Sequence, residues 1–377
     1  MFDREQLNFL QKYWLLIDKK LFYLYFLLLG FGLLFIFTAS MPVANRIGAS
    51  TNYFFIKKHL FFMCLSIFLF LFITIFSDNF TINVICLCFC VLLLMLVAVL
   101  FGGFSVKGAR RWLYILGFSI QPSEIIKPFL IIINSYILAK LKDKNDITKI
   151  ILSFIPYGLT CFLILLQPDI GMLMLLISIY ILQIFLSDIK FRTLLICGIS
   201  TILLMISCYI GLPHVRNRVN SYLVSLKDKD QMNYQVMTSI NGYNNSGLLG
   251  QGFLEGKAKN VIPDSHTDFI FPVITEEFGF FISTALILIY VYITLRVMIK
   301  AIKEEDTFKS LVLFGLSLLI IVQTFINIGV TLNLLPTKGM TLPFFSYGGS
   351  SLLGTSITFA FIIKYSRHHI VYDNHIQ

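Results

Sequence analysis

The stretch LNLLPTKGMTLPFFSYGGSSLLG, residues 332–354, lies between two strongly apolar runs and decides how the rest of the chain is interpreted. Pro336 and Pro343 interrupt helices, so the backbone between the two runs is predicted to be irregular. At membrane depth, irregular backbone is tolerated only against protein or a water-filled cavity. Residues 348–351 (GGSS) then start a new helix, whose free N–H groups favour an anion, and Lys338 adds positive charge. A tight re-entrant hairpin, with small residues for packing, is the alternative.

The composition places the chain in a membrane. Of its 377 residues, 57% are hydrophobic and 13% are charged, and the mean hydropathy is +0.82. A soluble domain of this length needs more polar surface. The net charge of +10 matches the short cationic loops of the positive-inside rule and does not require a nucleic acid partner. All seven cysteines lie in apolar runs, so we expect no disulfide framework and no thiol metal site.

Long apolar runs predict an all-α integral membrane protein with ten transmembrane helices. The whole chain, residues 1–377, is expected to form a single polytopic domain. One long extracytoplasmic segment, 212–269, is large enough to fold as a small cap. The predicted spans are 21–40, 59–77, 80–102, 123–141, 148–167, 169–187, 191–211, 270–295, 308–334 and 348–366.

The charges of the short loops favour cytoplasmic N- and C-termini. In this orientation, some cations remain in outer segments, where topology alone supplies no reason for them. Their presence suggests an anionic ligand on the outer side. These cations are Lys107, Arg110, Arg111, Lys257, Lys259 and Lys338.

The outer segment KGARRWLYILGFSIQPSEIIKP, residues 107–128, leads into the fourth predicted span. Ser123 is expected to cap that helix, and Glu124 suits its positive N-terminal end. Glu124 and Lys127 are three residues apart, so they can pair on one face. An internal ion pair is one interpretation. Because Lys127 lies about one turn inside the membrane, a functional role is the other.

A second polar segment, NVIPDSHTDFIFPVITEEFG (260–279), precedes the eighth predicted span. Asp268 stands at the water–lipid edge, where partial desolvation suits a carboxylate to act as a base. An N-cap of the eighth helix is the alternative role for Asp268. The spacing of Asp264, His266 and Asp268 also allows a metal site, although no thiol joins them.

Two polar residues fall in the middle of the ninth predicted span. Gln323 and Asn327 are four residues apart and share a helix face. They are expected either to form interhelical hydrogen bonds or to line a substrate path.

Four motifs together resemble the SEDS family, the polytopic proteins of cell shape, division and sporulation. They occur in that family's order and spacing, and the resemblance covers nearly the whole chain. Within the family, the Pro-Thr-Lys-Gly at 336–339 is similar to the cell-division branch, a choice that depends chiefly on Lys338. The motifs are GARRW with QPSE (108–124), QPDIG (167–171), HTDFIF (266–271) and LLPTKGMTLPFFSYGGSSLL (334–353).

The resemblance implies a peptidoglycan glycosyltransferase that polymerises lipid II at the outer face of the cytoplasmic (inner) membrane, at the division septum. It also implies that the protein works together with a class B penicillin-binding transpeptidase and other division proteins. The essential aspartate of the family falls on Asp268. The family commonly has Pro-Glu where this chain has Pro263-Asp264, so no role is assigned to Asp264. The substrate-binding candidates are Arg110, Arg111, Glu124, Lys127, Lys338, Ser346, Tyr347, Gly348, Gly349 and Ser350.

The chemistry of lipid II polymerisation fits these residues. A base must take the proton from the acceptor 4-hydroxyl, and Asp268 is placed for that step. The leaving pyrophosphate needs cations and hydrogen-bond donors, which Lys127, Lys338, Arg110 or Arg111 and the helix start can supply. No set of protein metal ligands is predicted. Whether a divalent cation (Mg²⁺ or Mn²⁺) binds together with the pyrophosphate is left open by the sequence.

Three alternative functions remain at this point. The chain could be a lipid II flippase, an elongation-type polymerase, or a non-catalytic scaffold for the transpeptidase. Transporters usually place their binding sites near the bilayer midplane, often between inverted repeats. Here the ionisable residues gather at one face and no repeat is visible, which favours chemistry over transport.

Overall fold

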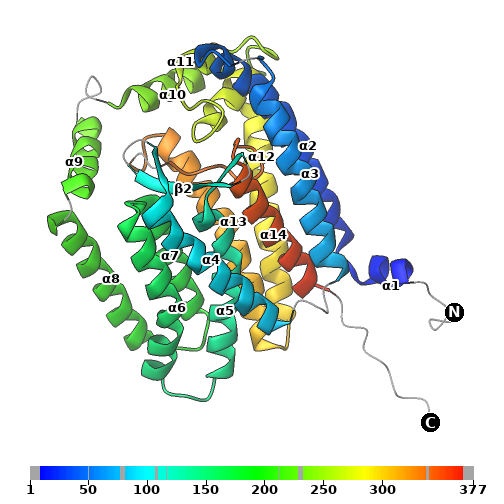
Figure 1. The fold of residues 1–377 in the computed structure, drawn as a ribbon, viewed down its shortest axis with the longest axis vertical. Helices are drawn as coiled ribbons and strands as arrows, with labels where there is room; N and C mark the ends of the chain where they lie inside the picture. The colour runs from blue at the N-terminus through cyan, green and yellow to red at the C-terminus, as the bar shows by residue number, and fades with distance from the viewer. Residues whose placement is uncertain are drawn as a thin grey trace.

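The computed structural model is a bundle of helices with a small cap at one end (Figure 1). It describes residues 9–49, 51–76, 81–106, 109–115, 117–211, 213–227, 232–336 and 339–367. Both described ends of the chain lie away from the cap. The helices of the bundle are α2 (Lys19–Arg46), α3 (Phe54–Ile75), α4 (Ile82–Gly102), α5 (Pro122–Lys140), α6 (Asp146–Leu166), α7 (Ile170–Phe185), α12 (Ile270–Lys303), α13 (Thr307–Thr331) and α14 (Gly349–Tyr365). A short α1 (Phe9–Leu16) precedes them, and α8 (Phe191–Gly211) stands at the side of the bundle (Figure 1).

Each predicted span coincides with one of these helices. Within the described residues, seven helices are long and apolar enough to cross a membrane: α2, α3, α4, α5, α6, α12 and α13. The other three predicted spans correspond to α7, α8 and α14. Of these, α7 and α14 have 16 and 17 residues, fewer than the roughly 20 needed to span the hydrocarbon core without distortion. The helical membrane fold is confirmed, and the count of ten crossings stays a prediction.

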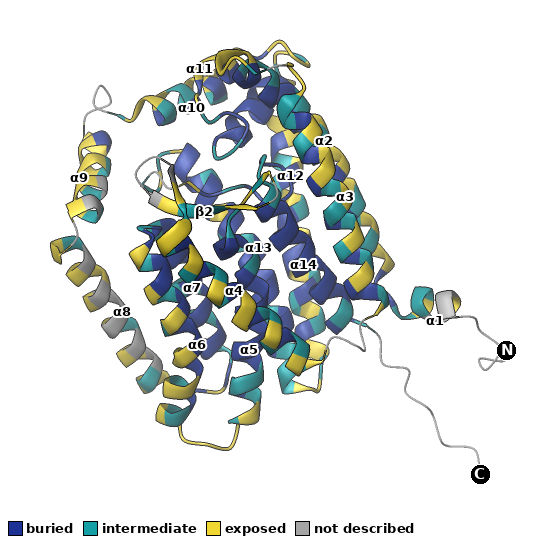
Figure 2. Ribbon diagram, viewed as in Figure 1, coloured by how far each residue is buried: buried dark blue, intermediate teal, exposed yellow. Residues whose placement is uncertain are grey.

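Burial separates the central helices from the outer ones (Figure 2). On α4, the buried side chains form a single stripe at helical spacing, Ile85, Phe89, Leu92, Leu96 and Val99, and the rest of its apolar surface is left for lipid. By contrast, almost every residue of α14 is buried. The helices α5, α13 and α14 form the centre of the bundle and pack against one another.

The segment before α5 forms a small antiparallel sheet, which the all-α prediction did not include. Its strands are β1 (Phe104–Val106), β2 (Ala109–Ile115) and β3 (Phe118–Ile120), in the order β1-β2-β3. Gly117 turns the chain between β2 and β3 with φ +86°, a conformation that favours glycine. The sheet contacts the ends of α4, α5 and α14.

The predicted outer segment contains three helices, α9 (Pro213–Lys227), α10 (Tyr234–Asn245) and α11 (Ala258–Val261). The helices α10 and α11 pack against each other and against α12 and form the cap, whereas α9 lies beside α8 (Figure 1). The loop after α10 packs against α12 where that helix is kinked at Gly279, whose φ is +82°. Gln251 N–H donates to the Glu276 carbonyl and Gly252 N–H to that of Glu277. The cap therefore satisfies carbonyl groups that the kink releases from the helix.

Candidate active site

Asp268 lies in a turn two residues before α12 and is half-buried. The N-cap of α12 is Phe269 and no side chain caps this helix, so the N-cap role considered for Asp268 is wrong. The side-chain N–H of Asn327 on α13 donates to the Asp268 carbonyl at 2.9 Å. A Cβ atom added to Gly339 would lie 3.1 Å from the Asp268 carboxylate. The candidate base is therefore held against the segment that follows Lys338.

The stretch between α13 and α14 is irregular, as predicted, and hydrogen bonds tie it to the turn of Asp268. The Ser346 hydroxyl donates to the Thr267 carbonyl at 2.6 Å and accepts from Leu342 N–H at 2.7 Å. Tyr347 N–H donates to the His266 carbonyl at 2.8 Å. Phe344 takes a left-handed conformation with φ +66°, which is strained for a bulky side chain and is found mostly where surrounding structure enforces it.

The predicted pair of Glu124 and Lys127 is confirmed. The Lys127 ammonium lies 2.6 Å from the Glu124 carboxylate and donates to the Gln323 side-chain oxygen at 2.8 Å. Both charged side chains are buried. The Gln323 amide donates in turn to the Thr341 carbonyl at 3.0 Å, and the Thr341 and Ser351 hydroxyls are 2.6 Å apart. A chain of polar contacts thus joins α5, α13, the irregular segment and α14.

The start of α5 differs from the prediction. The helix begins at Pro122, its N-cap is Gln121, and no side chain caps it, so the expected Ser123 cap is wrong. Proline at the first helical position lacks an N–H group and needs no cap there. Gln121 N–H instead donates to the Ser350 hydroxyl at 2.8 Å, and the Gln121 side chain donates to Ser123 at 3.1 Å. Ser350 therefore fixes α14 to α5.

The first turn of α14 has N–H groups that no side chain caps. Its N-cap is Gly348, and no side-chain hydrogen bond caps the helix. Gly349 packs directly against α3, because a Cβ atom there would meet the ring of Phe62 at 2.5 Å. The first turn of α14 is consequently a favourable place for an anion.

The outer cations do not all gather around one ligand site. Arg111 donates to the Pro168 carbonyl at 2.6 Å and lies 3.4 Å from the Asp169 carboxylate. These contacts join the GARRW and QPDIG motifs in space. Lys259 is buried and paired with Glu277, so its charge balances a carboxylate and needs no external anion. Arg110 lies exposed on β2, and Lys338 lies outside the described residues.

The three residues considered for a metal site do not converge. The Asp264 carboxylate accepts from the Gln235 side chain at 2.9 Å, and the His266 ring packs at 4.5 Å from the Phe55 ring and 5.4 Å from the Tyr347 ring, measured between centroids. Within the described residues, no group of three or more His, Cys, Asp or Glu side chains is arranged to hold a metal ion.

Three contributors to the site were missed or only partly predicted from the sequence. Thr341 links Gln323 to Ser351, but it looks like an ordinary hydroxyl residue in the motif. Gln323 and Asn327 were expected to bond to helices or to substrate. The interhelical hydrogen bond is confirmed for Gln323, which accepts from Lys127 on α5. Gln323 and Asn327 also bond to the irregular segment, at Thr341 and Met340. Their i, i+4 spacing was the available signal, and their partners depended on how that segment folds back.

Comparison with known proteins identifies relatives of this chain. Residues 19–370 match the FtsW/RodA/SpoVE family model, described as cell cycle protein. The chain is 32% identical to the "Probable peptidoglycan glycosyltransferase FtsW" of Caulobacter vibrioides (strain NA1000 / CB15N), covering 95% of this chain and 91% of that protein. 

Solved structures show the same fold. A chain of a peptidoglycan synthase complex, described as coordinating polymerization and crosslinking, has a TM-score of 0.73 at 24% identity, covering 93% of this chain and 97% of that one. Thermus thermophilus rod shape determining protein RodA has a TM-score of 0.66 at 24% identity, covering 94% and 97%. The resemblance carried by the four sequence motifs is confirmed, and this chain belongs to the FtsW/RodA/SpoVE family of cell cycle proteins.

Proposed function

We propose that this protein is a peptidoglycan glycosyltransferase that polymerises lipid II outside the cytoplasmic membrane. The observation that carries the proposal is the position of Asp268. Its half-buried carboxylate lies at the capped end of the bundle, beside Gly339 and ahead of α12. The relatives named as glycosyltransferases FtsW support the same activity.

In the proposed reaction, Asp268 takes the proton from the 4-hydroxyl of the acceptor sugar while that oxygen attacks the anomeric carbon of the donor. The bond from this carbon to the pyrophosphate breaks, and the lipid pyrophosphate leaves. The first-turn N–H groups of α14 and the cation Lys338 would stabilise the leaving charge. Lys127 would act through its contacts with Glu124 and Gln323, which position the segment containing Thr341.

A resident metal ion does not fit the side chains around Asp268. His266 packs against aromatic rings, and Asp264 accepts a hydrogen bond from Gln235. No step proposed here therefore uses a metal ion. A divalent cation (Mg²⁺ or Mn²⁺) that arrives with the pyrophosphate would be held by substrate oxygens. Adding a chelator to the polymerisation assay tests whether such a cation is needed.

The cell-division role and the partner are also part of the proposal. The similarity to FtsW proteins supports action at the division septum of the inner membrane, together with other division proteins. The fold shared with a peptidoglycan synthase complex supports pairing with a class B penicillin-binding transpeptidase. Imaging a fluorescent fusion at the septum or along the sidewall tests the division role against the elongation role.

The decisive experiment supplies lipid II to the purified protein and its transpeptidase partner in detergent. We expect glycan polymer from the native chain and a loss of about 10²- to 10⁴-fold in Asp268→Ala, the range typical of a positioned general base. Asp264→Asn is the matched control, because it removes a nearby carboxylate yet keeps an acceptor for Gln235. Native-like unfolding temperatures would establish that both variants fold.

Two outcomes contradict the proposal. If Asp268→Ala polymerises lipid II as well as the native chain, the protein is a scaffold and the polymerase lies elsewhere. If the native chain makes no polymer but moves lipid II across sealed vesicles, the protein is a flippase.

A further inference from the structure

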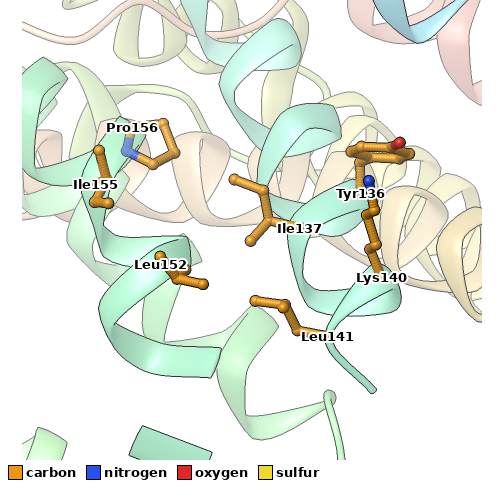
Figure 3. A pocket seen from close by; sticks show the side chains of 7 residues that line it. All are labelled: Tyr136, Ile137, Lys140, Leu141, Leu152, Ile155 and Pro156. Carbon is orange, nitrogen blue, oxygen red and sulfur yellow. The ribbon is translucent and has the colours of Figure 1, made fainter. Parts of the chain in front are cut away.

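A groove lies between α5 and α6, at the end of the bundle opposite the cap (Figure 3). Its volume is about 330 Å³, at the lower end of the roughly 300–1,000 Å³ typical of small-molecule sites. Lys140 lies 13 residues beyond Lys127 on α5, about 20 Å along the helix, so the groove is separate from the candidate active site. Its lining residues are Tyr136, Ile137, Lys140, Leu141, Leu152, Ile155 and Pro156.

The walls of the groove are apolar, and one cation stands at its edge. The Lys140 ammonium lies 5.7 Å from the centre of the Tyr136 ring. Lys140 forms no ion pair with any residue that the structure describes. An apolar surface with an unpaired cation at its rim complements a molecule with a hydrocarbon part and an anionic part.

A second cation on α6 points to the same chemistry. Lys149 is 5% exposed, yet across the described parts of the chain it has neither an ion pair nor a side-chain hydrogen bond. It belongs to the buried face of α6, together with Ser153 and Pro156, and this face adjoins the groove at Pro156. A buried ammonium without a counter-charge is costly, so an anion is expected beside it.

The surrounding charges favour the binding of an anion at this end of the bundle. Between positions 140 and 149 the chain carries four lysines and two aspartates. The Asp146 carboxylate is already engaged, since it accepts hydrogen bonds from Lys190 N–H and the Thr193 hydroxyl at 3.2 Å each. Asp143 is exposed in the loop. The ends of α5 and α6 at this level are where lipid headgroups meet a membrane protein.

We propose that this groove binds one anionic glycerophospholipid. An acyl chain lies along Ile137, Leu152 and Ile155, and the headgroup phosphate lies between Lys140 and Lys149. The occupant is assigned to a phospholipid because apolar walls and cations meet at the headgroup level. The bound lipid joins α5 to α6 and holds the helix that carries Glu124 and Lys127. This site is independent of glycosyl transfer.

The test uses the full-length protein, delipidated in detergent and then given phosphatidylglycerol or phosphatidylcholine, with retained lipid counted by native mass spectrometry. We expect the native chain to retain phosphatidylglycerol preferentially. Lys140→Gln and Lys149→Met should each lower its retention about fivefold, as expected for the loss of one lysine near an anionic headgroup. Lys149→Arg, which keeps the charge, should retain it.

Lys142→Gln is the matched control, because it removes an exposed lysine from the same loop without touching the groove. Unfolding temperatures in lipid-free detergent confirm that each variant folds. An equal loss in Lys142→Gln would overturn the site, since it would show general surface attraction. Equal retention of the two lipids, or full competition by inorganic phosphate, would overturn the assignment to an anionic phospholipid.

Discussion

The surroundings of Asp268, the candidate base, come mostly from distant parts of the chain. Its carbonyl is held by Asn327 and its carboxylate lies beside Gly339, about 60 and 70 residues further along the chain. A side chain at Gly339 would press on the carboxylate at 3.1 Å, tighter than an ordinary contact. Glycine at this position therefore leaves room beside the carboxylate that we propose as the base.

The buried pair of Lys127 and Glu124 gives a stability prediction. Removing one partner leaves an uncompensated buried charge, so Lys127→Met and Glu124→Leu should each lower the free energy of unfolding by about 3–5 kcal/mol. The double variant should lose clearly less than the sum, because neither charge is then left alone. Unfolding in detergent by denaturant measures all three. Additive losses would contradict the pair as the source of the effect.

At the scale of the element, the kink of α12 depends on Gly279. Its backbone has φ +82° and ψ 177°, a combination that is essentially confined to glycine. A Cβ atom there would also meet the Leu248 carbonyl oxygen at 2.5 Å. The kink and the cap loop therefore require each other.

Gly279→Ala is expected to destabilise the protein by at least about 1–3 kcal/mol, from backbone strain alone. Gly30→Ala is the matched control. Gly30 lies inside α2 with nothing within 4 Å of an added Cβ, so alanine should stabilise it by about 0.5–1 kcal/mol. Thermal unfolding of both variants measures the difference, and similar melting temperatures would contradict the role of the kink.

A second link between elements lies at the opposite end of the bundle. Asp18 caps α2 through Lys20 and Leu21 N–H groups and pairs with Arg296 and Lys300 on α12. Burial acts to raise the pKa of Asp18, but the two cations and the hydrogen bonds outweigh it and lower the pKa to about 2. One carboxylate therefore joins the start of α2 to the end of α12.

The pH dependence follows from that depressed pKa. In the unfolded chain the Asp18 carboxyl binds a proton more readily, because its pKa there is near the ordinary value of about 3.9. The ionised carboxylate therefore stabilises the folded state fully above about pH 4, and this stabilisation is lost as the pH falls towards 2. The difference of nearly two pKa units corresponds to about 2–3 kcal/mol. Asp18→Asn should remove this part of the acid sensitivity. An unchanged pH profile of unfolding in the variant would contradict the assignment.

At the scale of the whole molecule, the helices that supply the site are the central ones. Lys127 comes from α5, Gln323 and Asn327 from α13, and Ser351 from α14, all within the buried centre (Figure 2). Polar side chains in a membrane are costly unless other protein groups satisfy them. Their gathering at the capped end places the candidate chemistry on one side of the membrane.

The orientation of the molecule can be measured directly. In a chain whose own cysteines are replaced, Leu249→Cys in the exposed cap should react with an impermeant maleimide on intact cells. Lys144→Cys, in the exposed loop between α5 and α6, should react only after permeabilisation. The reverse pattern would place Asp268 on the cytoplasmic side, where it could not act on lipid II that has already crossed the membrane.

The amino-acid sequence alone determined the membrane character, the positions of the helices, the break between α13 and α14, and the pairing of Glu124 with Lys127. These features depend on hydropathy, proline and spacing within a few residues. Only the tertiary structure decided that Asn327 holds Asp268, that Arg111 and Lys259 are paired internally, and that Gln323 reaches Thr341. In a bilayer, lipid tails are as apolar as a protein core. Hydropathy therefore marks each helix but cannot say which faces meet, and these contacts, between residues 18 to 59 positions apart, follow from that packing.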